Sequence, residues 1–394
     1  LGYLASANES CGQLHAALTI REKALTYLDR EMFPQEYATL HVARLDYLTH
    51  LGQVAKALAI YDQEIEPIAS SHLINDPFYQ DVYLNARSFY ADLSLAGCLS
   101  SAFKTIEETA AMAEQRDPTG LGLFMKLLRA KGFLYRGHYD ACTRTLQGTL
   151  PAIEALGTTP DDETLAQTLM AQWGLLAMMT HCALGEWKEA RELALHSLLQ
   201  AEKSEEHLTW ILINTCAAQV AIAEGQLDDA RQILETMAGE SAERRFVGSA
   251  FVCWRLTAHI CYLQGETQQG LDLTRRALDI AKKTEVQSTY EILHLTVLQA
   301  RLLLQSGDIK HAGTLLQNQW ATIKQSEYKP LVADTATAIG ELYHAIAQQA
   351  KTDARQQQHL KKAHEFFGIS QAQWEKMNNP YALQQVHAQA SASA

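Results

Sequence analysis

Two stretches of the chain carry side chains with groups suited to binding chemistry. Arg255, His259 and Tyr262 fall on one predicted helix, and His294 and Arg301 fall on a helix farther along. An arginine presents a planar fork of N–H donors that matches a carboxylate or a phosphate. These residues therefore predict a recognition site for an anionic group, with a carboxylate, a phosphate or an acidic peptide as the ligand.

A metal site at the same place is the competing interpretation. Cys253, His259 and Cys261 are of metal-ligand type. On a helix, however, positions 253 and 261 lie about 80° apart and two turns distant, so their side chains do not converge. We expect core and groove residues here, and no metal.

Motifs of catalysis are missing from the sequence. It contains no GxxxxGK[ST] loop, no GxGxxG after a strand, no HExxH and no GxSxG. Cys182 follows His181 as in a cysteine phosphatase, but the arginine of that loop is missing, so Cys182 is predicted to be a buried thiol. The sequence predicts neither an enzyme nor a cofactor.

The composition narrows the fold class and the partners. Of 394 residues 47% are hydrophobic, with only 21 Gly and 8 Pro, which favours helix and excludes disorder. The net charge of −12 argues against direct nucleic-acid binding. Seven scattered cysteines without a CxxC pair favour a reducing cytoplasm, and no apolar run reaches the ~18 residues that a membrane span needs.

A repeat organises the chain around one glycine position. The glycine is followed by an aromatic or aliphatic residue two positions later and a small residue five positions later, in most copies. The eight copies begin at Gly12, Gly52, Gly97, Gly137, Gly185, Gly225, Gly265 and Gly307. The spacings are 40, 45, 40, 48, 40, 40 and 42 residues, so the repeat is nearly regular.

Each copy predicts a helical hairpin. An apolar helix runs up to the glycine, which permits the left-handed conformation that ends a helix. The small residue lets the second helix approach the first closely. One hairpin cannot bury its apolar face alone, so stacked neighbours must cover it, which predicts an α-solenoid.

The pattern resembles the tetratricopeptide repeat (TPR). Trp254 and Ala258 before Gly265, and Ala277 after it, match further positions of that repeat. The period is longer than the usual 34 residues, the terminal proline is mostly missing, and Cys142 and Gly270 replace alanine. The resemblance implies an all-α, right-handed superhelix of eight to nine hairpins over residues 1–387. The low-complexity Ala, Ser and Gln composition of residues 388–394 predicts a disordered tail.

Longer, degenerate repeats of this kind resemble the solenoid sensor domains of bacterial STAND-type signal-transduction ATPases, including the maltose-regulon activators. Only eleven residues precede Gly12, too few for its first helix, which predicts a piece of a longer protein. Near the other end, the segment from Met377 to Leu383 resembles the last helical pair that closes such a stack.

The resemblance also implies which residues face the concave groove. They lie 13, 10, 6, 3 and 2 residues before the glycine, which gives 35 positions in seven complete hairpins. Among these positions Asp46 is the one acid, so the groove is predicted to be neutral to basic. The candidate binding residues are Arg255, His259, Tyr262, His294, Arg301, Arg87, Lys131 and Gln219.

Two alternatives stay open at this point. Each arginine either binds a ligand or pairs with an acid on a neighbouring helix. The domain is either a sensor that regulates an attached N-terminal ATPase, with a small-molecule inducer or a protein partner in its groove, or a constitutive adaptor that recognises peptides.

Overall fold

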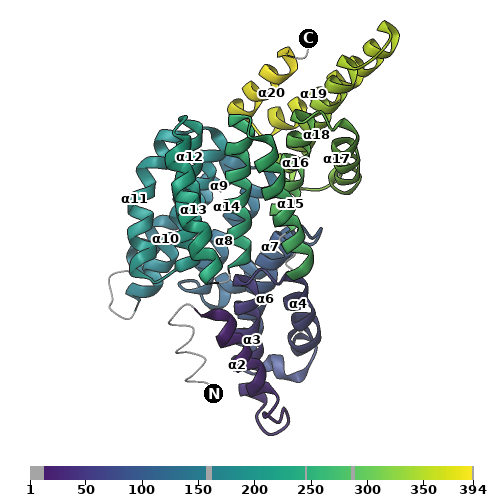
Figure 1. Ribbon diagram of the computed structural model, residues 1–394. Coiled ribbons are helices and arrows are strands. Elements are labelled where there is room, and N and C mark those ends of the chain that lie inside the picture. Colours follow the sequence, from purple (N-terminus) through teal and green to yellow (C-terminus); the bar gives the residue numbers. More distant parts are fainter. Residues whose placement is uncertain (1–12, 157–161, 245, 285–288, 393–394) are drawn as a thin grey trace.

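The computed structural model describes residues 13–156, 162–244, 246–284 and 289–392. Within these ranges every regular element is a helix, and consecutive helices pack as antiparallel hairpins. Figure 1 shows the array running from α2 (Leu14–Leu25) at its lower end to α20 (Pro380–Ala392) at its upper end. The all-α repeat superhelix predicted from the sequence is therefore confirmed.

The first helices of the described hairpins are α3 (Pro34–His50), α6 (Pro77–Ala96), α8 (Leu121–Arg136), α10 (Glu163–Leu184), α12 (His207–Ala223), α14 (Val247–Gln264), α16 (Thr289–Gln305) and α18 (Lys329–Gln348). Their partners are α4 (Val54–Ile60) with α5 (Glu66–Ala69), α7 (Ala102–Arg116), α9 (Tyr139–Leu156), α11 (Trp187–Lys203), α13 (Leu227–Glu243), α15 (Thr267–Thr284), α17 (Ile309–Ile323) and α19 (Asp353–Lys376). A π-helical turn, η1 (Tyr61–Ile65), joins α4 to α5, and a 3₁₀ turn, η2 (His72–Asn75), precedes α6.

The repeat glycine ends the first helix as predicted in most hairpins. The backbone is left-handed, with φ between 70° and 84°, at Gly52, Gly137, Gly185, Gly225, Gly265 and Gly307. At Gly97 the prediction is wrong, because φ is −77° there and the next residue, Cys98, takes the left-handed turn at 55°. Gly12 lies outside the described residues.

The small residue of the repeat brings the two helices of a hairpin together. Ala57, Ala102, Cys142, Ala190, Ala230 and Ala312 are all completely buried. At Gly270 an added Cβ would lie 2.8 Å from Leu302 Cδ2 of α16 and 3.3 Å from Cys261 Cβ of α14, so α15 lies close to both helices here. A small residue at this position therefore allows the helices to pack closely.

Successive turns of the superhelix touch each other. The rings of Tyr135 on α8 and Tyr290 on α16 stack with centroids 4.1 Å apart and planes 8° apart. The hydroxyl of Tyr328, just before α18, donates to the backbone oxygen of Leu95 on α6 at 3.0 Å. Helices α16 and α18 therefore close onto α6 and α8.

The last helix runs farther than the sequence suggests. Helix α20 extends to Ala392, so residues 388–392 are helical where a disordered tail is predicted. Residues 393 and 394 lie outside the described residues. Among the helices of the described ranges, none combines the length and the apolar character needed to cross a membrane.

Candidate functional site

Three consecutive first helices bring five charged side chains together. On α14, Arg255 Nε donates to Glu291 Oε2 of α16 at 3.0 Å. On α16, Arg301 Nε donates to Glu341 Oε2 of α18 at 3.0 Å, and its Nη2 lies 2.9 Å from Asp334 Oδ1. We call these five residues the charged network.

The charged network is only partly shielded from water. Its side chains are between 16% and 29% exposed, with Glu291 the most buried and Asp334 the most exposed. Residues on several helices surround it, because Tyr135 of α8 and Cys216 of α12 also interact electrostatically with Arg255. Side chains of α8 and α12 therefore lie near the network, in addition to those of α14, α16 and α18.

Burial and charge act against each other in the network. Burial alone would raise the pKa of Asp334, but Arg301 beside it holds that pKa below its usual range. For Glu341, burial outweighs the attraction of Arg301, and the pKa is raised. The same two carboxylates overcome the burial of Arg301 and raise its pKa. Of the two carboxylic acids that bind Arg301, Glu341 is therefore the weaker acid.

Two histidines next to the network are neutral at physiological pH. Burial lowers the pKa of His259 to about 4, and the positive charges of Arg301 and Arg255 add to this effect. The pKa of His294 is lowered for the same reasons, with Arg255 as the main charge. Neutral imidazoles offer one donor and one acceptor each, so they can hydrogen-bond a ligand without adding charge.

The donors of Arg255 are largely unused. Its Nε binds Glu291, whereas neither Nη group has a hydrogen-bond acceptor among the described residues. Arg301, by contrast, engages both Nε and Nη2. Arg255, with 25% of its side chain exposed, is therefore the member of the network that can donate hydrogen bonds to the carboxylate or phosphate of a ligand.

The remaining predicted residues lie elsewhere in the array. Arg87 on α6 donates to the Tyr83 hydroxyl at 2.7 Å and to Glu108 at 2.7 Å. Lys131 on α8 pairs with Asp92 of α6 at 2.6 Å.

Tyr262 joins the network region on α14, where its ring lies 6.4 Å from that of His259. Gln219 is half-buried on α12. The structure thus gathers the predicted residues of α14 and α16, with Arg87, Lys131 and Gln219 on three other helices.

Sequence reasoning missed the acids of the groove. Beside Arg255 and Arg301 the structure places three carboxylates, and none of them is at a groove position that the repeat pattern predicts. Glu291 lies 16 residues before Gly307, one turn beyond the positions of a shorter repeat. Asp334 and Glu341 lie on α18, whose hairpin lacks the glycine that served to locate groove positions. The length of the predicted helices was the signal that could have found Glu291.

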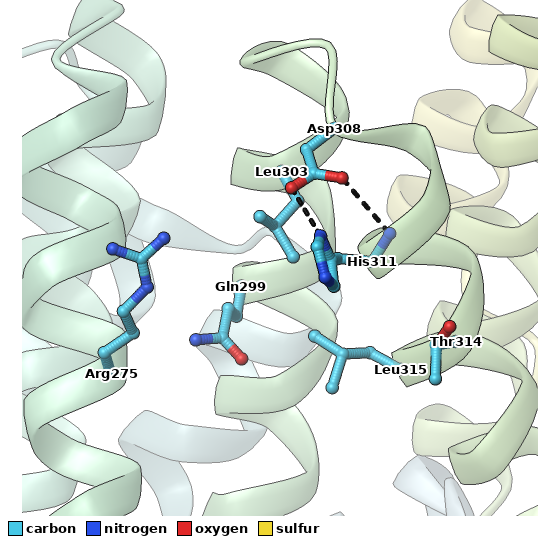
Figure 2. Close-up of a pocket in the computed structure, with 7 residues that line it drawn as sticks. All are labelled: Arg275, Gln299, Leu303, Asp308, His311, Thr314 and Leu315. Atoms are coloured by element: carbon cyan, nitrogen blue, oxygen red, sulfur yellow. Dashed lines mark hydrogen bonds and ion pairs between the residues drawn. The ribbon is translucent and has the colours of Figure 1, made fainter.

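A separate pocket of about 370 Å³ lies between α15, α16 and α17 (Figure 2). Asp308 and His311 line it, but Asp308 caps α17 by accepting from the His311 backbone N–H and binds His311 Nδ1 at 2.6 Å. These polar groups serve the helix end. Arg275 at the rim pairs with Asp272.

Of the six cysteines in the described part of the chain, five are buried and Cys98 is half-buried. Burial raises the pKa of Cys182 to about 12, which keeps this thiol protonated. Six cysteines are free and Cys11 lies outside the described residues. In the described part of the chain, no three His, Cys, Asp or Glu side chains gather into a group suited to a metal ion.

Comparison with known proteins places the fold. No protein-family model matches the chain, and no curated protein matches it. A Rap protein in complex with the competence and sporulation factor matches at 9% identity, with a TM-score of 0.56, over 91% of this chain and 98% of that one.

Two further structures match with much lower similarity. The TPR domain of P58(IPK) aligns at 13% identity over 90% of this chain and 97% of that one, with a TM-score of 0.24. The APC/C hetero-tetramer Cut9–Hcn1 aligns at 12% identity over 99% and 92%, with a TM-score of 0.25. The likeness to the Rap protein concerns the fold, and this chain is a TPR-like array of helical repeats.

Proposed function

We propose that residues 1–387 form one non-catalytic recognition domain, which binds an inducer or a protein partner in its concave groove. The observation that carries this proposal is Arg255, a half-buried arginine whose two Nη groups have no partner among the described residues. A guanidinium held at one edge by Glu291 leaves its other edge for a ligand. An acceptor with two oxygens satisfies both free donors at once.

The chemistry around Arg255 selects the ligand class. A carboxylate or a phosphate matches the guanidinium, and the neutral His259 and His294 add hydrogen bonds. The acids of the network repel additional negative charge. We therefore expect a ligand with one anionic group and otherwise polar or positive character, such as a peptide with a single acidic residue.

A sensor and an adaptor differ in what binding does. We favour a sensor that regulates an attached N-terminal ATPase in the cytoplasm, because an anionic ligand on Arg255 adds a negative charge beside acids that are paired across three helices and so favours a different arrangement of them. The Rap protein of similar fold was solved with a bound factor, so a superhelix of this kind accommodates one. A constitutive adaptor is the second candidate, and it needs no such rearrangement.

The groove proposal is tested with a library of fluorescent heptapeptides that carry zero, one or three acidic residues. We expect the peptides with one acid to bind the protein, and the Arg255→Gln variant to bind them at least ~10-fold more weakly. Arg231→Gln is the matched control, because Arg231 on α13 pairs with Glu266 at 2.8 Å and is 22% exposed, much like Arg255. Equal binding by the two variants would reject the groove site.

The natural coding sequence distinguishes the sensor function from the adaptor function. A P-loop ATPase encoded upstream in the same reading frame supports the sensor, and its ATPase rate must then change when the selected peptide is added. A frame without any nucleotide-binding or output module favours the adaptor.

A further inference from the structure

The connection between α19 and α20 is seated on an earlier turn of the superhelix. Asn379 in this connection is 1% exposed, and its Nδ2 donates to the backbone oxygen of Ala183 at the end of α10, at 2.9 Å. The ring of Tyr381 meets that of Trp187 edge-on, with centroids 5.4 Å apart. We call residues 377–381 the C-terminal clasp.

Two repeat glycines form the seat of the clasp. A Cβ added at Gly137 would lie 2.0 Å from Met377 Sδ, and one added at Gly185 would lie 2.5 Å from Tyr381 Cγ. At Gly225, Gly265 and Gly307 the same added atom would meet nothing within 4 Å. All five glycines share the left-handed backbone, with φ between 74° and 84°. The close contact with the clasp is therefore specific to Gly137 and Gly185, and it is not a general feature of the repeat glycine.

The contacts of the clasp are distinct from those that hold each hairpin together. Helix α19 packs along its hairpin partner α18, and α20 packs against α19. In a repeat array each hairpin is stabilised by itself and its neighbours. The α18–α19 hairpin therefore keeps its own packing whether or not the clasp is seated.

We propose that the C-terminal clasp is a releasable closure of the superhelix, and that its release frees α19 and α20 from α8 and α10 and so widens the concave groove at this end. In the closed state Tyr381 and Met377 lie against the two glycine turns and Asn379 binds Ala183. In the open state these contacts are lost while the hairpins stay intact. That the closure controls access to the groove rests on the function proposed above.

The groove and the closed turn share helix α16. Tyr290 at its start stacks on Tyr135 of α8 across the turn, and the next residue, Glu291, holds Arg255 in the groove. A ligand on the free Nη edge of Arg255 places a second negative charge near Glu291, which lies directly beside this stack. One short segment thus connects the ligand site to the contact between turns.

Gly185→Ala tests the clasp, and Gly225→Ala is its matched control. Both substitutions place a methyl group on the same left-handed backbone, but only the first displaces Tyr381. We expect Gly185→Ala to speed amide hydrogen exchange in residues 377–392 at least ~10-fold and to increase the radius of gyration by X-ray scattering. Gly225→Ala should do neither.

Asn379→Asp provides a second variant that keeps the helix cap. Its carboxylate still accepts from the Ala382 backbone N–H, as Asn379 Oδ1 does at 2.9 Å, but it can no longer donate to Ala183. Asn214→Asp is the control, because the Asn214 amide donates to Trp210 within α12. We expect the exchange of α20 to speed up in Asn379→Asp alone.

Two results would overturn the closure. The first is that Gly185→Ala and Asn379→Asp show the same amide exchange rates and the same radius of gyration as their control variants. The other is a loss of helical circular dichroism in these variants, since a releasable clasp must open without melting.

A separate measurement tests whether the clasp controls access to the groove, namely the association rate of the peptide selected above. A faster association rate in Gly185→Ala supports this control. An unchanged rate, in a variant whose clasp is shown to be open, rejects it. A wild-type protein that binds no peptide contradicts the groove function alone.

Discussion

Tyr135 and Tyr290 stack almost in parallel, with ring centroids 4.1 Å apart, although one lies on α8 and the other on α16. Burial raises the pKa of both hydroxyl groups well above the usual value, so the pair is neutral. The stack joins helices that are four first helices apart in the array. It is therefore a contact of the superhelix and not of any one hairpin.

Removing one ring should weaken the contact between turns. We expect Tyr290→Ala and Tyr135→Ala to show a coupling of about 1 kcal/mol in a double-mutant cycle of urea unfolding, as for other aromatic pairs. Tyr290→Phe keeps the stack and should leave stability nearly unchanged. Additive effects of the two alanine variants would show that the rings do not stabilise each other.

The two arginines of the charged network should differ in their effect on stability. Arg301→Gln leaves both Asp334 and Glu341 without their counter-ion and should cost about 3 kcal/mol of unfolding free energy. Arg255→Gln leaves only Glu291 and should cost less, about 1–2 kcal/mol. Arg275→Gln breaks an exposed pair with Asp272 and should cost under about 1 kcal/mol. Equal losses for Arg301 and Arg255 in urea unfolding would contradict this ranking.

His259 should make the protein sensitive to mild acid. Its pKa is about 4 in the folded chain, against 6.5 for a free histidine, so only the unfolded state takes up a proton between these values. The contribution of His259 is complete above pH ~6.5 and falls by up to about 1.4 kcal/mol per pH unit as the pH drops toward ~4. His259→Gln should reduce the fall of the melting temperature between pH 6.5 and 4.5, and the buried His41 and His294 should account for part of the slope that remains. His196→Gln, at an exposed site on α11, is the control and should leave the slope as in the wild type.

The repeat pattern predicts the hairpins well because it records local requirements. A left-handed turn favours glycine, and a tight helix crossing requires a small residue, whatever surrounds the hairpin. Cys98 shows the limit of this reasoning. There the turn moves by one residue, and a side chain other than glycine adopts φ of 55°.

The contacts of the candidate site are harder to predict from the sequence than the hairpins are. The sequence predicts Arg255 and Arg301 as a pair, but their partners Glu291 and Glu341 lie on neighbouring helices at positions set by helix length and stacking. The seat of Tyr381 on Gly185 depends on the curvature of the whole array. Curvature sums small rotations over many hairpins, so no local pattern specifies it.

The hydrogen bond from Tyr328 to Leu95 also bears on how the chain folds. It spans 233 positions, and the bond from Asn379 to Ala183 spans 196. A linear array folds through local contacts alone, which are formed fast. Closing this superhelix has to wait until the intervening hairpins are in place, because only they bring the two ends of each bond together. Folding should therefore finish with a slow, concerted step that joins distant parts of an otherwise locally folding chain.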